Sequence, residues 1–188
     1  IKGGRTVHDY WPSFKSVAVN ASIDGIFDVY EYIRGNSKFQ TVVDNIKEIK
    51  KISNVSRVVG AFTAQAGNIL QAAECVDYFI NEMDIVFYSH RVSYPQVLSA
   101  QVLPRELKDL AIERLRTVRD RVPKFDNVKK HPILLPITLR QIDDNINYLD
   151  AKDQNDKWDD FLKFNRKLDI TRQQGPIEAI VPEFKPYV

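Results

Sequence analysis

The stretch Val17-Ala18-Val19-Asn20-Ala21-Ser22-Ile23-Asp24-Gly25 decides the fold of this chain. Alternate residues of a β-strand point to opposite faces of a sheet. One face then carries aliphatic side chains that can pack on helices, namely Val17, Val19, Ala21 and Ile23. The opposite face becomes more polar toward its carboxyl end, with Ala18, Asn20, Ser22 and Asp24. Ligands bind at that end in parallel α/β folds, so we expect a buried strand whose last polar residues face a ligand.

The length and composition of the chain narrow its class. A chain of 188 residues is long enough for one domain with a substantial core and too short for two ordinary ones. A content of 44% hydrophobic and 28% charged residues is typical of a globular protein. The net charge of +2 gives no electrostatic basis for binding nucleic acid. No apolar run approaches the roughly 20 residues that span a bilayer. From the charge and from the apolar runs, we therefore expect neither nucleic acid nor a membrane as a partner.

Cysteine and histidine usage predicts no metal site. Cys75 is the single cysteine, so it can form neither an intrachain disulfide nor an iron–sulfur site, and we expect it to be a small buried hydrophobic residue. A reducing, cytoplasmic location is the natural expectation for such a chain. His8, His90 and His131 have no metal-ligand spacing relative to one another.

Hydrophobic periodicity predicts an alternation of strands and helices. Strand-like runs cover 17–23, 58–63 and 85–88, and helical stripes follow them at 39–49, 68–80 and 104–123. Asn68 is expected to cap its helix, and Pro104 suits a helix start. Repeated strand–helix units favour a mostly parallel sheet with right-handed crossovers. The predicted fold class is therefore α/β, as a partial (β/α) half-barrel.

The pattern changes after Pro123. Residues 133–149 predict a loop and a short helix, and Trp158, Phe161, Leu162 and Leu168 form the stripe of another helix. The tail 175–188 contains three prolines and is expected to be extended and docked on the body. We therefore expect residues 1–122 to hold the (β/α) units, and 123–188 to be a helical extension and docked tail of the same domain.

Several motifs occur in an order that resembles a known family. They are Ser22-Ile23-Asp24-Gly25, Tyr32-Ile33-Arg34, Ser37-Lys38-Phe39, Asn68 after the next strand, Tyr94-Pro95-Gln96 and Leu168-Asp169-Ile170-Thr171-Arg172. In this order they resemble the second half of a radical S-adenosylmethionine enzyme, of the twitch-domain type common in phage and environmental sequences. Each motif is weak alone, and the resemblance lies in their order and spacing across nearly the whole chain.

The resemblance implies a set of cofactor-binding residues. The residue that matches Ser22 binds the ribose or amino-acid part of S-adenosylmethionine in the family, and the matching arginine, here Arg34, engages its carboxylate. Asn20 shares the face of Ser22, and Thr63 and Asn68 lie at the end of the next strand. The resemblance does not identify a catalytic residue or a substrate.

Each of these residues also has an ordinary structural interpretation. Ser22 suits a hydrogen-bonded strand end, and Arg34 suits a surface ion pair with Asp28 or Glu31. Helix capping alone explains Asn68. Asp24-Gly25 is good turn chemistry, and a turn is the interpretation that we favour for it.

One departure from the family pattern is decisive for activity. Family members hold a [4Fe–4S] cluster on a CxxxCxxC loop, and this sequence has no such motif. The resemblance therefore implies S-adenosylmethionine and the cluster in an intact protein, a truncated and inactive domain here, and neither cofactor bound to this chain. The alternative is a non-catalytic α/β interaction module or scaffold that has lost the cluster. In both cases a half-barrel leaves a sheet edge exposed, so we expect a homodimer through that edge.

Overall fold

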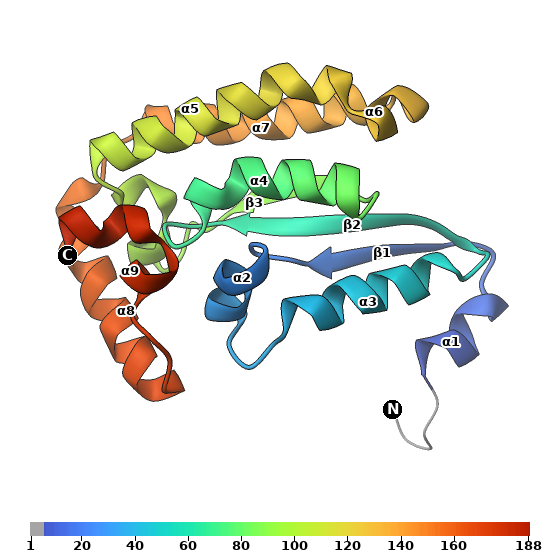
Figure 1. The fold of residues 1–188 in the computed structure, drawn as a ribbon, viewed down its shortest axis with the longest axis horizontal. Coiled ribbons are helices and arrows are strands. Elements are labelled where there is room, and N and C mark those ends of the chain that lie inside the picture. The colour runs from blue at the N-terminus through green and yellow to red at the C-terminus, as the bar shows by residue number, and fades with distance from the viewer. Residues whose placement is uncertain (1–5) are drawn as a thin grey trace.

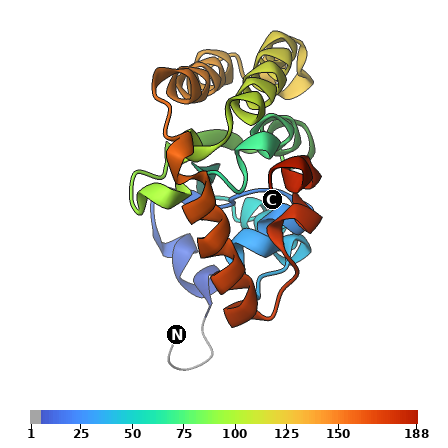
Figure 2. The ribbon, with the colours of Figure 1, turned by 90° about the vertical axis from the view of Figure 1, so that its left-hand side faces the viewer.

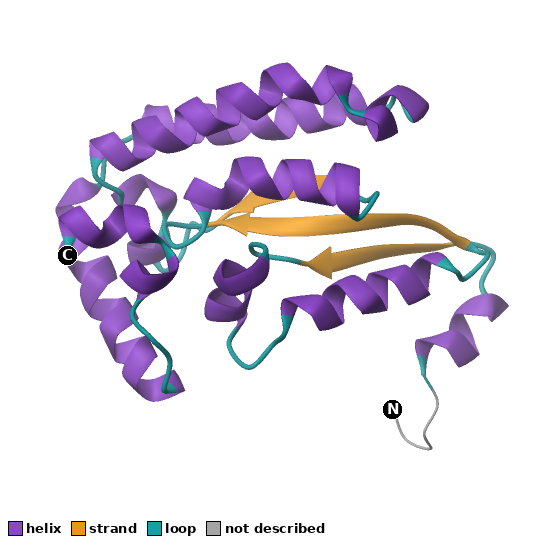
Figure 3. Ribbon diagram, in the orientation of Figure 1, coloured by secondary structure: helices purple, strands orange, loops and turns teal. Residues whose placement is uncertain are grey.

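The structure is a computed structural model that describes residues 6–188, apart from the side chain of His8. Its sheet has three strands, β1 (Val17–Ser22), β2 (Val55–Ala64) and β3 (Val86–Arg91), in the order β1-β2-β3. Both neighbouring pairs are parallel, and all three strands point toward the same end of the molecule (Figures 1 and 3). The prediction of an α/β fold with a parallel sheet is confirmed.

Helices provide every connection between the strands, as parallel pairing requires. The described helices after β1 are α2 (Phe27–Arg34), α3 (Phe39–Lys50), α4 (Ala72–Asp77), α5 (Arg105–Arg121), α6 (Asp126–Lys130), α7 (Leu134–Ala151), α8 (Trp158–Arg172) and α9 (Ile177–Ile180). A short helix, α1 (Val7–Tyr10), precedes β1. The bounds of α3, α5 and α8 lie close to their apolar stripes, whereas α2 was not expected and α7 is longer than its predicted segment.

One face of the sheet packs against helices and forms the centre of the core. Phe62 and Phe87 lie on this face with no exposed surface, and Phe79 packs against Phe87 from the turn after α4. Gly60 allows that close approach, because a Cβ at this position would lie 2.6 Å from the Phe79 ring. The alternation predicted for β1 is confirmed, since half-buried Val17, Val19 and Ala21 alternate with exposed neighbours.

The opposite face, which we call the open face, is less covered. The parallel register places Ser22, Ala61 and Tyr88 in one row across this face, and Thr63 beside His90 in the next. Asn20 and Ser22 are exposed, and Tyr88 is 40% exposed. The polar side of the predicted first strand is therefore open to solvent.

The two edges of the sheet differ. On the β3 side, α7 lies against the strand, and the Ser89 amide donates a 2.8 Å hydrogen bond to Gln141 Oε1. On the other side, β1 pairs only with β2 within residues 6–188. A helix therefore shields one edge, as soluble proteins commonly arrange, while β1 remains an edge strand.

The C-terminal segment covers the end of the sheet to which the strands point. There α8 crosses in front of the strand ends (Figure 2), and Tyr32 on α2 donates a 2.7 Å hydrogen bond to Asp169 on α8. The tail is docked as predicted, since Phe184 is fully buried and Trp158 Nε1 donates to the Tyr187 carbonyl. The prediction of an extended tail is wrong. The tail forms α9 and a 3-10 turn over Pro182–Tyr187, because Pro176 and Pro182 stand at helix-start positions that tolerate proline.

Among the described residues, no helix combines the length and the apolar character needed to cross a membrane.

Candidate functional site

The five residues predicted to bind a cofactor divide into two groups. Arg34, Thr63 and Asn68 meet around Asp24, at the carboxyl ends of β1 and β2. Asn20 and Ser22 lie along the open face of β1 instead. The predicted strand end therefore does bring polar groups together, in two adjoining places.

Asp24 is the centre of the first group. Its side chain is nearly buried, its Oδ1 accepts a 2.7 Å hydrogen bond from the Thr63 amide, and its Oδ2 lies 2.7 Å from Arg34 Nη2. Gly25 follows with φ +138°, and a Cβ there would lie 2.9 Å from Val29 Cγ1, so the chain bends at a position that favours glycine, without the hydrogen bond of a tight turn. The turn interpretation missed the role of the carboxylate, which connects the ends of two strands to α2. A buried carboxylate needs hydrogen-bond or ion-pair partners, so the position of Asp24 at the end of a strand could have indicated this role from the sequence.

The ion-pair partner of Arg34 differs from both carboxylates that were expected for it. Its partner is Asp24 rather than Asp28 or Glu31, and Glu31 pairs with Lys38 at 2.5 Å. The Arg34 side chain remains 34% exposed. A guanidinium has five N–H donors, so the pair with Asp24 leaves donors available to a second acceptor.

Asn68 has a structural role that uses both ends of its amide. Its Nδ2 donates to the carbonyls of Asp24 at 3.2 Å and Thr63 at 3.0 Å, and its Oδ1 accepts from the Gln65 amide at 2.9 Å. The residue is 1% exposed. Asn68 does stand at the N-cap of the 3-10 helix Ile69–Gln71, but its side chain makes no capping bond and binds the preceding turn and the strand ends instead.

Asn20 and Ser22 are the exposed polar groups of the region. Neither side chain has a hydrogen-bond partner among the described residues. The small Ala61 separates Ser22 from Tyr88 within their row. Neighbouring strands lie about 4.8 Å apart, so the row spans roughly 10 Å from the hydroxyl to the aromatic residue. This distance suits a flat ligand lying across Ala61.

A separate cavity of about 530 Å³ opens where the end of α2 faces the end of α8. None of the five predicted residues lines it. Three of its charged groups are engaged internally, because Glu31 pairs with Lys38 and Arg172 donates to the carbonyls of Tyr32 and Ile33. Asp28 also lines the cavity and forms no ion pair or hydrogen bond with a described side chain. The hydrogen bond from Lys38, with a second from the Phe39 amide, lowers the pKa of Glu31. Arg172 thus caps the carboxyl end of α2, where a positive charge is favoured.

Burial raises the pKa of two side chains, Tyr32 and Cys75. Burial, followed by the hydrogen bond to Asp169, raises the pKa of Tyr32, which therefore stays protonated at neutral pH. Cys75 is fully buried, and this burial raises the pKa of its thiol well above the ordinary value. The expectation of a small, buried cysteine is confirmed.

The described residues contain no group of three or more histidine, cysteine, aspartate or glutamate side chains placed to hold a metal ion. The single, buried Cys75 cannot supply the three thiolates of a [4Fe–4S] cluster. A cluster therefore does not fit the residues of this chain.

No protein-family model, curated protein or solved structure matches this chain. What the site can do follows from its own residues.

Proposed function

We propose that this chain is the cluster-free part of a radical S-adenosylmethionine-like partial barrel. In this proposal the open face is one wall of an S-adenosylmethionine pocket, and the cluster is held by a half that lies outside this chain. Reductive cleavage of S-adenosylmethionine, with an unknown substrate, belongs to the intact protein, and this chain alone is inactive.

The observation that carries the proposal is the asymmetry of the sheet. Helices cover one face, whereas the other exposes Asn20 and Ser22 near the carboxyl end of β1. Exposed polar groups at the carboxyl end of a parallel strand are the usual position of a ligand in α/β folds. A half-barrel would present this face to its own interior.

The residues of the chain have distinct roles in this proposal. Ser22 supplies a hydroxyl to the ribose or the amino-acid part of the ligand, and Asn20 supplies an amide on the same face. Arg34 offers its remaining donors to the ligand carboxylate while Asp24 holds the guanidinium in place. Thr63 and Asn68 act indirectly, because their hydrogen bonds fix Asp24.

A second function, a non-catalytic interaction module, is favoured by the internal partners of the polar cluster. Arg34 and Asn68 already have partners within the chain, and all of these contacts stabilise the strand ends. Such contacts would persist in a scaffold that binds no cofactor.

Calorimetric titration of the chain with S-adenosylmethionine separates the two functions. We expect weak binding, lowered about threefold by Ser22→Ala, which removes one neutral hydrogen bond, and about tenfold or more by Arg34→Gln. Ser53→Ala, at an exposed turn, is the matched control for the serine variant. Thermal melting of Arg34→Gln checks that the lost pair with Asp24 has not unfolded the chain.

Two results would favour the interaction module instead. One is the absence of any heat of binding, and the other is an affinity that neither Ser22→Ala nor Arg34→Gln changes. Either result would remove the support for a cofactor wall on the open face.

The exposed edge supports the proposal of a homodimer. Residues 17–22 of β1 contain no charge and no proline, which are the devices that protect edge strands from pairing. We expect light scattering to show a dimer, and Asn20→Lys to shift it toward the monomer. A monomer at high micromolar concentration in the unaltered chain would refute the dimer.

A further inference from the structure

A second cavity lies at the opposite end of the sheet from Asp24. It has a volume of about 330 Å³ and lies at the amino ends of β2 and β3, next to the start of α7. Arg57, which lines it, precedes Thr63 by six positions on β2, a separation of about 20 Å along the strand. The cavity adjoins the amino end of the open face, since Arg57 pairs with Ala18, but none of the five residues assigned to the function proposed above lines it.

Its walls are largely apolar and come from separate parts of the chain. Val55 and Val86 contribute from the strands, Ile80 from the turn after α4, and Leu134 from α7. Small-molecule sites are typically apolar hollows of roughly 300–1,000 Å³ with a few polar groups. The cavity has the size and lining of this class.

The polar groups at the cavity carry a net positive charge. Lys50 is neutralised, because its ammonium lies 2.7 Å from Asp84 Oδ2 and also donates to the carbonyl of Met83. Arg57 also lines the cavity and is exposed, and no described residue forms an ion pair or hydrogen bond with its side chain. The side chain of His131 is likewise without a partner among the described residues. An unpaired guanidinium beside an apolar hollow attracts an anion that carries an apolar body.

The exposure of Ile133 also favours a ligand with an apolar body. Its side chain lines the cavity and is 73% exposed. A large aliphatic side chain gains stability when a ligand removes its surface from water. The cavity therefore offers uncovered apolar surface beside an unpaired cation.

We propose that this cavity binds an aliphatic carboxylate. The hydrocarbon chain lies among Val55, Val86 and Ile133, and the carboxylate accepts hydrogen bonds from Arg57. The planar guanidinium fork matches a carboxylate with two parallel hydrogen bonds, and His131 adds a ring N–H donor at the same cavity. A single arginine beside a mainly apolar wall suits one negative charge better than a doubly charged phosphate.

The test is a two-dimensional amide NMR titration of the full chain with octanoate, kept below its micelle concentration. Octanol and octyltrimethylammonium serve as neutral and cationic probes of the same chain length. We expect saturable shifts for octanoate at residues 55–58, 85–86 and 131–134, with weaker binding of octanol and none of the cation. Arg57→Gln should weaken octanoate binding about tenfold or more.

Two further variants test the apolar contact and control for the loss of an arginine. Ile133→Ala should weaken octanoate and octanol alike, and its exposed position leaves the fold intact. Arg166→Gln, an exposed arginine on α8, is the matched control and should change nothing. The inference is overturned if octanoate shifts no amides at these residues, if octanol binds as tightly as octanoate, or if Arg57→Gln leaves the affinity unchanged.

The oligomeric state is followed in the same samples. If a second copy of the chain occupied the cavity, octanoate would dissociate a dimer instead of binding a species of constant mass. That outcome would replace the carboxylate by a protein segment and would likewise overturn the inference.

Discussion

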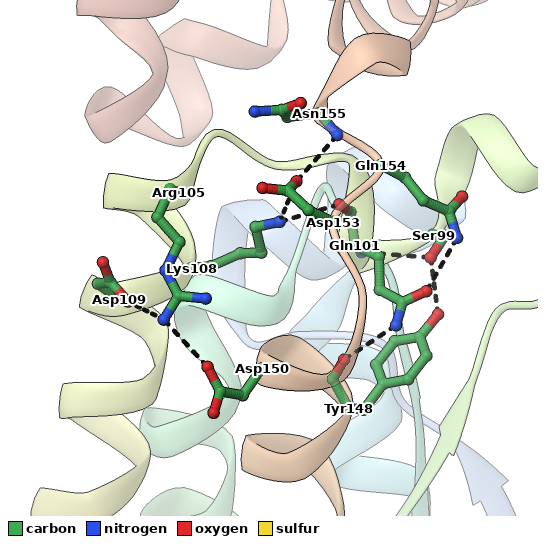
Figure 4. A network of polar contacts seen from close by, with 10 residues as sticks. All are labelled: Ser99, Gln101, Arg105, Lys108, Asp109, Tyr148, Asp150, Asp153, Gln154 and Asn155. Atoms are coloured by element: carbon green, nitrogen blue, oxygen red, sulfur yellow. Dashed lines mark hydrogen bonds and ion pairs between the residues drawn. The ribbon is translucent and has the colours of Figure 1, made fainter.

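The buried lysine of α5 offers the sharpest test of the energetics of this fold. The Lys108 side chain is 1% exposed, and its ammonium donates to Asp153 Oδ1 at 2.7 Å and to the Gln101 carbonyl at 3.2 Å (Figure 4). These contacts join α5 to the segment after α7 and to the 3-10 turn before α5. Replacing Asp153 by asparagine keeps the shape of the side chain, removes its charge and exchanges one acceptor oxygen for an NH2 group.

The expected cost of this change follows from the burial of the lysine. Breaking a buried ion pair by removing one partner costs about 3–5 kcal/mol, because the remaining charge stays desolvated. Asp153 is itself 51% exposed, so water can approach from its side. We therefore expect Asp153→Asn to lower the free energy of unfolding by the lower bound, about 3 kcal/mol.

The partner substitution behaves differently. Lys108→Met removes the buried charge and fills nearly the same space, so we expect a loss of only about 1 kcal/mol. In this background Asp153→Asn should cost almost nothing, since no buried charge is left unpaired. The double-mutant cycle should give a coupling energy of about 2–3 kcal/mol.

Urea unfolding followed by circular dichroism measures all four chains, with the slope m expected to stay constant. Asp109→Asn is the control, since Asp109 forms an exposed pair with Arg105, and its stability should not change measurably. The reasoning is refuted if Asp153→Asn costs less than about 1 kcal/mol, or if it costs as much in the Lys108→Met background.

The dependence on pH gives an independent check of the same pair. The hydrogen bond from Lys108 lowers the pKa of Asp153 below its ordinary value of 3.8. A carboxyl whose pKa is lowered by folding stabilises the native state above its unfolded pKa, and this stabilisation disappears as the pH falls through the folded pKa. The unaltered chain should therefore lose more stability below about pH 4 than Lys108→Met does.

Two further predictions follow from other parts of the core. Gly60→Ala should lower the free energy of unfolding by about 1–3 kcal/mol, because the new methyl group would overlap the Phe79 ring, whereas Gly175→Ala, with open space around it, should not destabilise the chain; equal urea midpoints for the two variants would contradict this account. Tyr32→Phe should reduce the loss of stability above pH 10, because burial and the hydrogen bond to Asp169 raise the pKa of Tyr32, so that only the unfolded chain ionises there. Urea unfolding at several alkaline pH values measures this loss. An equal fall of the unfolding free energy with pH in both chains would argue against it.

The helices show which elements can be predicted from sequence. Apolar residues recur at helical spacing in α3 and α5, and the bounds of both helices lie close to that stripe. The helix α2 was missed although Val29, Tyr30 and Tyr32 are buried on one of its faces, because eight residues give only about two turns of such a pattern. Its buried Tyr32 is held by Asp169, a residue 137 positions away, so the contact that fixes α2 is not a local one.

In the candidate site too, local patterns predicted some features and distant contacts decided others. Strand alternation placed Asn20 and Ser22 on the polar face of β1, and both are exposed there. The partner of Arg34 was not predictable, because a side chain of its length reaches several carboxylates within one or two helical turns. In the folded chain Arg34 pairs with Asp24, while Glu31 pairs with Lys38.

The sequence by itself determined the parallel α/β alternation, the apolar, half-buried face of β1 and the polar character of its carboxyl end, because these depend on residue periods of two and 3.6. Only the tertiary structure decided that Asp24 is a buried junction rather than a turn residue, that Asn68 fastens two strand ends, and that Arg57 is left unpaired beside an apolar cavity. These outcomes depend on which distant backbone and side-chain groups meet when the core closes. No local pattern in the sequence encodes those meetings.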